Sequence, residues 1–212
     1  MIRKFFANNR LTFIVAFVAL VVLPLLAALV SSNDSPRITP TASSVVGVAY
    51  PQNYRQTFAH YATVQRPDGT IRDLYINQSS LSSIRTFYNL SVGTVIVVEG
   101  YNALKNADGS YVTDADGHYI KGEIMPFIHV REKRDHWSAA DFTSSARNND
   151  WNYGSFDTQT GAIYQESLNA CFLCHNTADN DFTYSAQQLL DFVRSGQPDY
   201  FMCQTTGRTA CE

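Results

Sequence analysis

Cys171, Cys174 and His175 form a C-x-x-C-H motif, with Phe172 and Leu173 between the two cysteines. Two thiols at this spacing can add to the two vinyl groups of a haem as thioethers, and the adjacent imidazole can then reach the iron as an axial ligand. The motif therefore predicts one covalently bound haem c, with Cys171 and Cys174 as attachment sites and His175 as the proximal iron ligand.

Other uses of a closely spaced cysteine pair fit the sequence less well. A thioredoxin-like dithiol is expected in a βαβ setting, which the surrounding sequence does not indicate. A zinc site would need a second ligand pair at short spacing, and Cys203 and Cys211 have seven residues between them. In an exported chain this second pair instead predicts a disulfide, with haem ligation by Cys203 as the alternative.

Composition indicates one compact domain with an appendage. The chain has 212 residues, of which 45% are hydrophobic and 17% are charged. Aromatic residues make up 13%, enough to enclose a planar cofactor, although a β-rich core would also use them. The formal net charge is -3, and no basic cluster lies beyond the N-terminus, so no nucleic-acid partner is expected.

The N-terminal residues predict a membrane anchor. Arg3, Lys4 and Arg10 precede residues 11–30, which carry no charge. At about 1.5 Å per helical residue this run spans roughly 30 Å, the hydrocarbon thickness of a bilayer. The positive charge before it places residues 1–10 in the cytoplasm and the remaining chain on the periplasmic side of the inner (cytoplasmic) membrane. A cleaved signal peptide is the alternative, although its apolar region is usually only about 7–15 residues long.

The folded domain is expected at residues 45–193, between a linker and a tail. Residues 31–44 are rich in Ser, Thr and Pro, as is typical of a linker, and residues 194–212 form a short C-terminal tail. Strand signals dominate the domain, so the predicted fold class is α+β, a mostly antiparallel sheet with a few helices. Strands are expected at 58–64, 71–76, 94–99, 123–132 and 151–157, and helices at 78–88, 168–175 and 185–193.

Turn residues and one proline refine this prediction. Residues 66–69 predict the turn of a hairpin, and two Asp-Gly turns within residues 106–117 predict a second, protruding hairpin. The start of a calcium loop at residues 114–117 is the alternative there, but Met125 occupies the position of the closing carboxylate. Pro126 within the strand at 123–132 requires a sheet edge or a bulge.

Several segments follow one another along the chain in a distinctive order: Pro51–Arg55, Gly93–Glu99, Val130–Glu132, Trp151, the C-x-x-C-H motif and Asp181–Thr183. This order resembles the cytochrome P-460 family, which includes the cytochromes c′-β. The resemblance covers residues 50–193. It implies a mostly antiparallel β fold with helices, commonly a homodimer, and a five-coordinate haem with His175 proximal and an open distal side.

The resemblance also implies which positions decide the activity. In the hydroxylamine-oxidising members a lysine cross-links to the haem, and its position falls on Val98. A distal glutamate moves protons in those members, and its position falls on Phe127 or, with a one-residue shift, on Ile128. None of these apolar side chains can form the cross-link or transfer a proton. An aromatic distal residue is similar to cytochrome c′-β, whose members bind nitric oxide.

Strand alternation indicates a distal haem face independently. Met125, Phe127 and His129 share one face of the strand at 123–132. If that face covers the haem, Phe127 would exclude water and polar substrates and still admit a diatomic gas. His129 as a sixth ligand is the alternative, which would make the protein an electron carrier. Met125 and Met202 are weaker candidates, because methionine mostly fills gaps in cores.

Two classes of function therefore follow from the sequence. The first is a membrane-anchored cytochrome that binds small gases, such as nitric oxide or carbon monoxide, or transfers electrons with a redox partner protein. The second is a haem enzyme acting on a small nitrogen compound such as hydroxylamine or nitric oxide. An acid or base in the distal pocket would favour the enzyme, and His129 is the candidate for that role.

Overall fold

The computed structural model describes residues 47–84, 89–165 and 167–203, all of which belong to one unit spanning residues 43–212. The predicted anchor at 11–30, the linker at 31–44 and Cys211 lie outside the described residues. In the described part of the chain, no helix has the length and apolar character needed to cross a bilayer.

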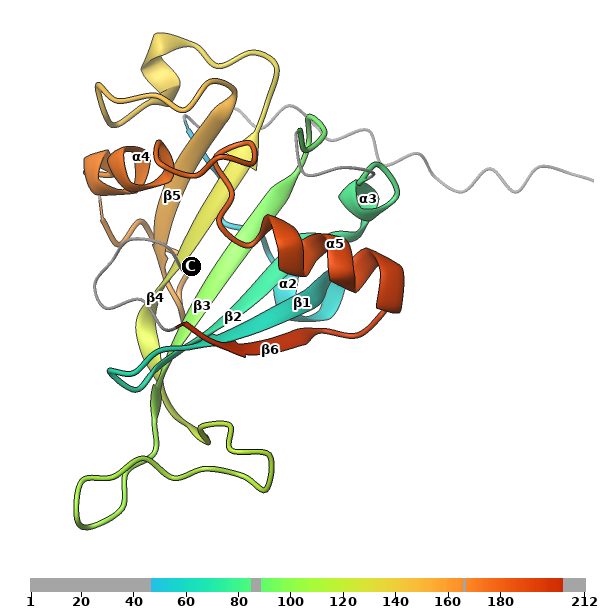
Figure 1. Cartoon of the computed structure of the whole chain (residues 1–212). Coiled ribbons are helices and arrows are strands. Elements are labelled where there is room, and N and C mark those ends of the chain that lie inside the picture. The colour runs from blue at the N-terminus through green and yellow to red at the C-terminus, as the bar shows by residue number, and fades with distance from the viewer. Residues whose placement is uncertain (1–46, 85–88, 166, 204–212) are drawn as a thin grey trace, which may run out of the picture. The chain divides into compact units, whose positions relative to one another are not determined.

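Six strands form one sheet in the order β5-β4-β3-β2-β1-β6 (Figure 1). The strands are β1 (Phe58–Gln65), β2 (Thr70–Asn77), β3 (Val95–Ala103), β4 (Lys121–Lys133), β5 (Trp151–Asp157) and β6 (Asp199–Met202). All neighbours are antiparallel except β1 and β6, which are parallel. The predicted α+β class and the five predicted strands are confirmed.

The sixth strand lies in the segment for which only a tail was expected. β6 begins after Pro198 and pairs with the second half of β1, where Ala62 is opposite Asp199. The backbone N–H of Cys203 then donates to the carbonyl of Gln65 at 2.7 Å. The sheet therefore extends past Val193.

Four α-helices and one 3₁₀ turn accompany the sheet in the described residues. They are α2 (Tyr54–Thr57), α3 (Gln78–Leu81), η2 (Ala139–Asp141), α4 (Asn169–His175) and α5 (Ala186–Ser195). The last two α-helices match the predictions at 168–175 and 185–193. The helix predicted at 78–88 ends at Leu81, and residues 85–88 lie outside the described residues.

Asn77 is the N-cap residue of α3, but its side chain does not cap the helix. Its amide oxygen accepts from the backbone N–H of Val95 at 2.9 Å and from the hydroxyl of Ser80 at 2.9 Å. The amide therefore ties α3 to the start of the central strand β3.

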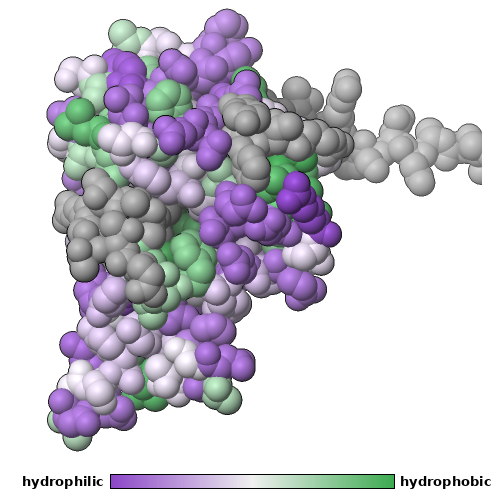
Figure 2. Space-filling view, in the orientation of Figure 1, coloured by the Kyte–Doolittle hydropathy of each residue, from purple (hydrophilic) through white to green (hydrophobic). Residues whose placement is uncertain are grey.

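The two faces of the sheet have separate hydrophobic cores. We call them the α4 face and the α2 face, after the helices packed on them. Core residues of the α4 face include Leu74, Ile96, Trp151, Tyr153, Phe172 and Leu189. Those of the α2 face are Val48, Tyr54, Val97, Ile128, Val130 and Phe156. In Figure 1, α4 and α5 lie in front of the sheet and α2 lies behind it, and Figure 2 shows a hydrophilic outer surface on α5.

The segment between β3 and β4 leaves the sheet as the protruding hairpin that was predicted (Figure 1). The hydroxyl of Tyr111 donates to the carbonyl of Asp68 at 2.6 Å, which fixes the hairpin to the β1–β2 turn. The ring lies over Gly69, where an added Cβ would be 2.2 Å from a ring carbon. Gly69 also has φ +82, so both its conformation and its contact require glycine.

Pro126 lies in β4, which has a neighbouring strand on each side and is therefore not an edge strand. Glu99 is opposite Ile128, whereas Tyr101 is opposite Ile124, so the β4 side contains extra residues at this point. This irregularity is the predicted bulge, and it accommodates the missing N–H of proline.

Candidate functional site

The C-x-x-C-H motif lies on α4, which presents both thiols on one side. Cys171 and Cys174 are three residues apart and thus share a helix face, and both are partly exposed. Phe172 is 1% exposed and anchors the helix in the core of the α4 face. Its carbonyl accepts a hydrogen bond from the amide of Asn148 at 3.1 Å. The helix is therefore fixed through Phe172 while the thiols stay accessible.

The imidazole of His175 is held in one tautomer. Its Nδ1 lies 2.7 Å from the carbonyl oxygen of Phe182. A carbonyl can only accept, so the proton lies on Nδ1 and the lone pair lies on Nε2. The ring packs between Tyr153 and Tyr184, with centroid distances of 5.1 and 5.5 Å. This is the arrangement in which a metal-ligating histidine is oriented by its second ring nitrogen.

Two cations of β4 meet the loop that follows the motif. Arg131 Nη1 donates to the carbonyl of Phe182 at 2.7 Å, and Lys133 Nζ lies 2.8 Å from a carboxylate oxygen of Asp181. Both cationic residues are nearly buried, at 3% and 4% exposure. Asp181 and Phe182 have φ values of 52° and 58°, a left-handed conformation that is uncommon for residues other than glycine. The loop beside His175 is thus strained and held by buried charges.

The register of β3, β4 and β5 arranges the α4 face in successive rows. The row beside His175 contains Ile96, Arg131 and Tyr153, and the next contains Val98, His129 and Ser155. The third row contains Phe127 and Asp157. Neighbouring rows are two residues, or about 7 Å, apart. The proposed proximal histidine and the predicted distal residues therefore belong to different levels of one surface.

The predicted distal residues gather at the far end of this surface. The rings of Phe127 and His129 have centroids 5.0 Å apart, as strand alternation predicts. A Cβ added to Gly100 would lie 2.6 Å from the sulfur of Met125, so Met125 covers Gly100. Ile128 instead packs in the core of the α2 face. Of the two alternatives for the glutamate position, only Phe127 lies on the face of His129.

Sequence reasoning missed Arg131, Lys133 and Ser155 as residues of this surface. The available signal was the strand predicted at 123–132, in which alternation places Arg131 on the face of His129; Lys133 lies one residue beyond the predicted strand. Ser155 carried no signal, because its position depends on the pairing of β5 with β4.

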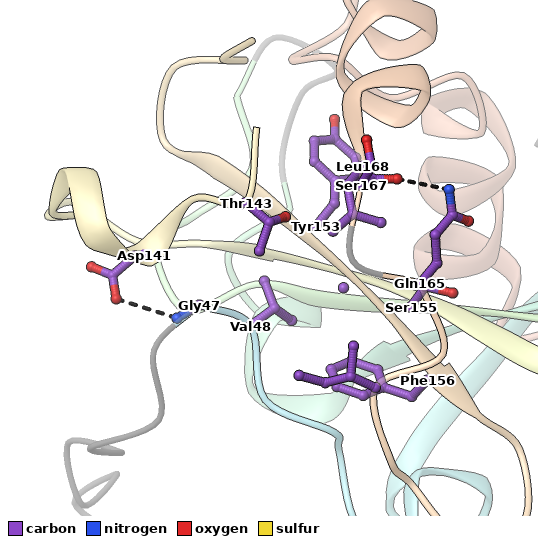
Figure 3. A pocket seen from close by; sticks show the side chains of 12 residues that line it. Gly47, Val48, Asp141, Thr143, Tyr153, Ser155, Phe156, Gln165, Ser167 and Leu168 are labelled. Atoms are coloured by element: carbon purple, nitrogen blue, oxygen red, sulfur yellow. Dashed lines mark hydrogen bonds between the residues drawn. The ribbon is translucent and has the colours of Figure 1, made fainter. Parts of the chain in front are cut away.

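A cavity of about 480 Å³ opens beside the edge strand β5 (Figure 3). It is lined by residues 47–48, 141, 143, 153–156, 163, 165 and 167–168. Asp141 and Gln165 are already hydrogen-bonded to backbone groups there. The hydroxyl of Ser155 is buried and has no hydrogen-bond partner among the described residues. No residue of the C-x-x-C-H motif lines this cavity, and Tyr153 stands between the two.

The donor set of the motif fits a haem better than a metal ion held by side chains. Among the described residues, a cluster of at least three possible metal ligands occurs only at Asp114, Asp116 and His118, in the protruding hairpin. Asp114 there accepts the backbone N–H groups of the other two residues, as in an ordinary turn. Two accessible thiols and one oriented imidazole, without a fourth ligand, suit covalent attachment of a haem.

The sequence profile of the family named Cytochrome P460 matches residues 51–185, well over half of the chain. The chain belongs to the cytochrome P460 family. A search of curated proteins finds no match. Membership confirms the resemblance found in the sequence and supports a c-type haem protein. The matched range contains the whole C-x-x-C-H motif together with Arg131 and Phe182.

The predicted disulfide involves a residue outside the described part of the chain. Cys203 is 1% exposed and packs in the core of the α4 face. Because Cys211 lies outside the described residues, the pairing stays a prediction. Met202, the last residue of β6, is partly buried, and haem ligation by it or by Cys203 also stays untested.

Proposed function

We propose that this cytochrome P460 family member is a membrane-anchored cytochrome with one haem bound covalently to Cys171 and Cys174 and ligated by His175. Its iron is five-coordinate and takes up a small gas, such as nitric oxide or carbon monoxide, or exchanges electrons with a redox partner. The observation that carries this proposal is the bond from His175 Nδ1 to the carbonyl of Phe182, because it places the ring proton on Nδ1 and so makes Nε2 the nitrogen whose lone pair can ligate iron.

When bound, the haem supplies an iron that can hold a diatomic ligand or take up one electron. The protein residues orient the iron and control access to it. His175 and the loop after α4 fix the proximal side. Val98 and His129 would border the haem, and Phe127 would cover the distal side. A phenyl ring has no hydrogen-bond donor, so it would exclude water and give little stabilisation to a polar bound ligand.

A haem enzyme is the second candidate, and the position of His129 favours it. His129 lies on the α4 face beside Phe127 and could serve as a distal acid or base. Hydroxylamine oxidation is disfavoured, because apolar Val98 and Phe127 occupy the positions of the cross-linking lysine and the distal glutamate. We expect the purified holoprotein to turn over hydroxylamine very slowly or not at all with a suitable electron acceptor.

The anchor, the periplasmic location and a homodimer are part of the same proposal. Residues 11–30 support the anchor through their length and lack of charge. The full-length protein should stay with the membrane through a carbonate wash and retain its N-terminal residues in mass spectrometry. A mature N-terminus near Ser31 would show a cleaved signal peptide instead.

Absorption spectra of the full-length holoprotein test the proposed iron coordination. The ferrous protein should be high-spin and should bind carbon monoxide and nitric oxide without displacing a protein ligand on the distal side. A six-coordinate low-spin ferrous spectrum that becomes high-spin in His129→Ala would contradict the proposal. That result would make His129 the sixth ligand and the protein an electron carrier.

A further inference from the structure

The carbonyl of Phe182 has two donors. It accepts from Nδ1 of His175 and from Nη1 of Arg131, both at 2.7 Å, and these two nitrogens are 3.3 Å apart. A carbonyl oxygen has two lone pairs and can accept both bonds. A guanidinium stays charged throughout the ordinary pH range. A permanent positive charge thus lies beside the imidazole.

The guanidinium of Arg131 is held in this place by its surroundings. The residue is 3% exposed, and its guanidinium carbon lies 5.0 Å from the centroid of the Trp151 ring. Arg131 belongs to β4, which is paired on both sides. It therefore has little freedom to turn away from the loop after α4.

The acceptor is fixed as firmly as the donor. Phe182 has φ 58°, and the preceding Asp181 has φ 52°. Such backbone conformations persist only where neighbouring groups hold them. Here one oxygen of the Asp181 carboxylate accepts from Lys133 Nζ and from the backbone N–H of Leu90, each at 2.8 Å. The chain thus maintains a strained turn that presents one carbonyl to both Arg131 and His175.

We propose that Arg131 is a positioning residue that raises the reduction potential of the haem and weakens the bond between iron and His175. This inference rests on the proposed haem attachment. A carbonyl that accepts the Nδ1 proton makes imidazole a stronger donor to its metal. Arg131 donates to the same oxygen and so makes that oxygen a weaker acceptor of the Nδ1 proton. The positive charge of Arg131 also disfavours the more positive ferric state.

The test compares three full-length holoproteins with the wild type by redox titration and by resonance Raman spectroscopy of the ferrous state. Arg131→Gln removes the charge and should shift the ferric–ferrous equilibrium roughly tenfold toward ferric, or about 59 mV for one electron. The iron–histidine stretching frequency should rise in the same variant. Arg131→Lys keeps the charge but loses the planar guanidinium. The potential and the stretching frequency should therefore change in the same directions as in Arg131→Gln, but less.

Arg134→Gln is the matched control. It removes the same charge just after β4, from a guanidinium that pairs with Glu132 and lies 4.1 Å from the centroid of the Trp137 ring. It should change the potential and the stretching frequency much less than Arg131→Gln does.

The outcomes separate this inference from the proposed function. Equal shifts in Arg131→Gln and Arg134→Gln would overturn the role of Arg131. If Arg131→Gln does not accumulate, an Arg131→Lys protein with the potential and stretching frequency of the wild type would overturn it as well. A wild-type protein that carries no covalent haem would instead refute the proposed attachment itself.

Discussion

Both faces of the sheet bury charged side chains, but the charges differ in sign and in the exposure of their partners. On the α2 face the buried groups are the carboxylates of Glu99 and Asp73, which are opposite each other on β3 and β2. Their cationic partners, Arg55 and Lys121, have side chains that are 43% and 35% exposed. On the α4 face the buried groups include the cations Arg131 and Lys133, and the carboxylate of Asp181 that pairs with Lys133 is buried as well.

The carboxylates of the α2 face are satisfied by their own surroundings. Glu99 accepts from the hydroxyls of Tyr54 and Tyr101 at 2.6 and 2.8 Å, and it pairs with Arg55. Burial raises the pKa of both tyrosines, and the hydrogen bond to Glu99 raises it further, so both stay protonated donors. These donors all belong to the fold itself, so the carboxylate of Glu99 stabilises the fold.

The buried cations of the α4 face act on a neighbouring loop. Arg131 and Lys133 hold the segment whose carbonyl orients His175. We infer from this difference that a buried carboxylate with a partly exposed cationic partner stabilises the fold. A buried cation that bonds a strained backbone segment beside the cofactor motif positions the site. Variants on each face should therefore change different measurements.

Removing the thiols should have the largest effect and should be confined to the α4 face. Cys171→Ala combined with Cys174→Ala should abolish covalent haem, because both thioethers are lost. Acid-acetone should leave the haem on the wild-type protein, and pyridine haemochrome spectra should detect none bound covalently to the double variant. Extraction of haem from the wild type would refute covalent attachment.

Glu99→Gln should destabilise the fold and leave the haem spectrum unchanged. The side chain is fully buried, and loss of its charge weakens hydrogen bonds worth about 1.5–3 kcal/mol in the free energy of unfolding. Urea unfolding measures this change. Glu132→Gln is the control, because the pair of Glu132 with Arg134 is partly exposed and should contribute less than about 1 kcal/mol. Equal losses in both variants would contradict the comparison.

Asp73 should make the α2 face sensitive to acid. Burial alone would raise the pKa of Asp73, but hydrogen bonds from His60, Lys121 and Thr63 outweigh it and hold the pKa below the ordinary value. A carboxyl with a lowered pKa in the folded state stabilises the fold above its unfolded pKa of about 3.9, and that contribution is lost as the pH falls through the folded value. Between pH 6 and pH 3, Asp73→Asn should lose less stability than the wild type. An identical slope would show that Asp73 does not contribute.

The strands that position the site could be predicted, because alternation and turn residues mark them along the chain. β6 could not, since four residues that begin after Pro198 show no extended alternation and gain their place by pairing with β1. The C-x-x-C-H motif identified the cofactor ligands directly. The shared carbonyl of Phe182 was beyond prediction, because a left-handed phenylalanine has no sequence signature and is held there by residues distant in the chain.

Phe127 separates gas binding from simple electron transfer. Its ring is partly exposed and contacts His129 and Tyr164, with centroid distances of 5.0 and 4.9 Å. Truncation of a fully buried phenylalanine costs about 3–5 kcal/mol, so Phe127→Ala should cost less than that.

The same change should speed the binding of carbon monoxide to the ferrous protein, because it removes the apolar side chain that would cover the distal side. Stopped-flow association rates measure this effect. Tyr164→Ala is the matched control, because it removes the ring that packs on Phe127 from a side chain that is itself 48% exposed. If the two variants bind carbon monoxide at the wild-type rate while His129→Ala accelerates binding, then His129 controls the distal side and Phe127 does not.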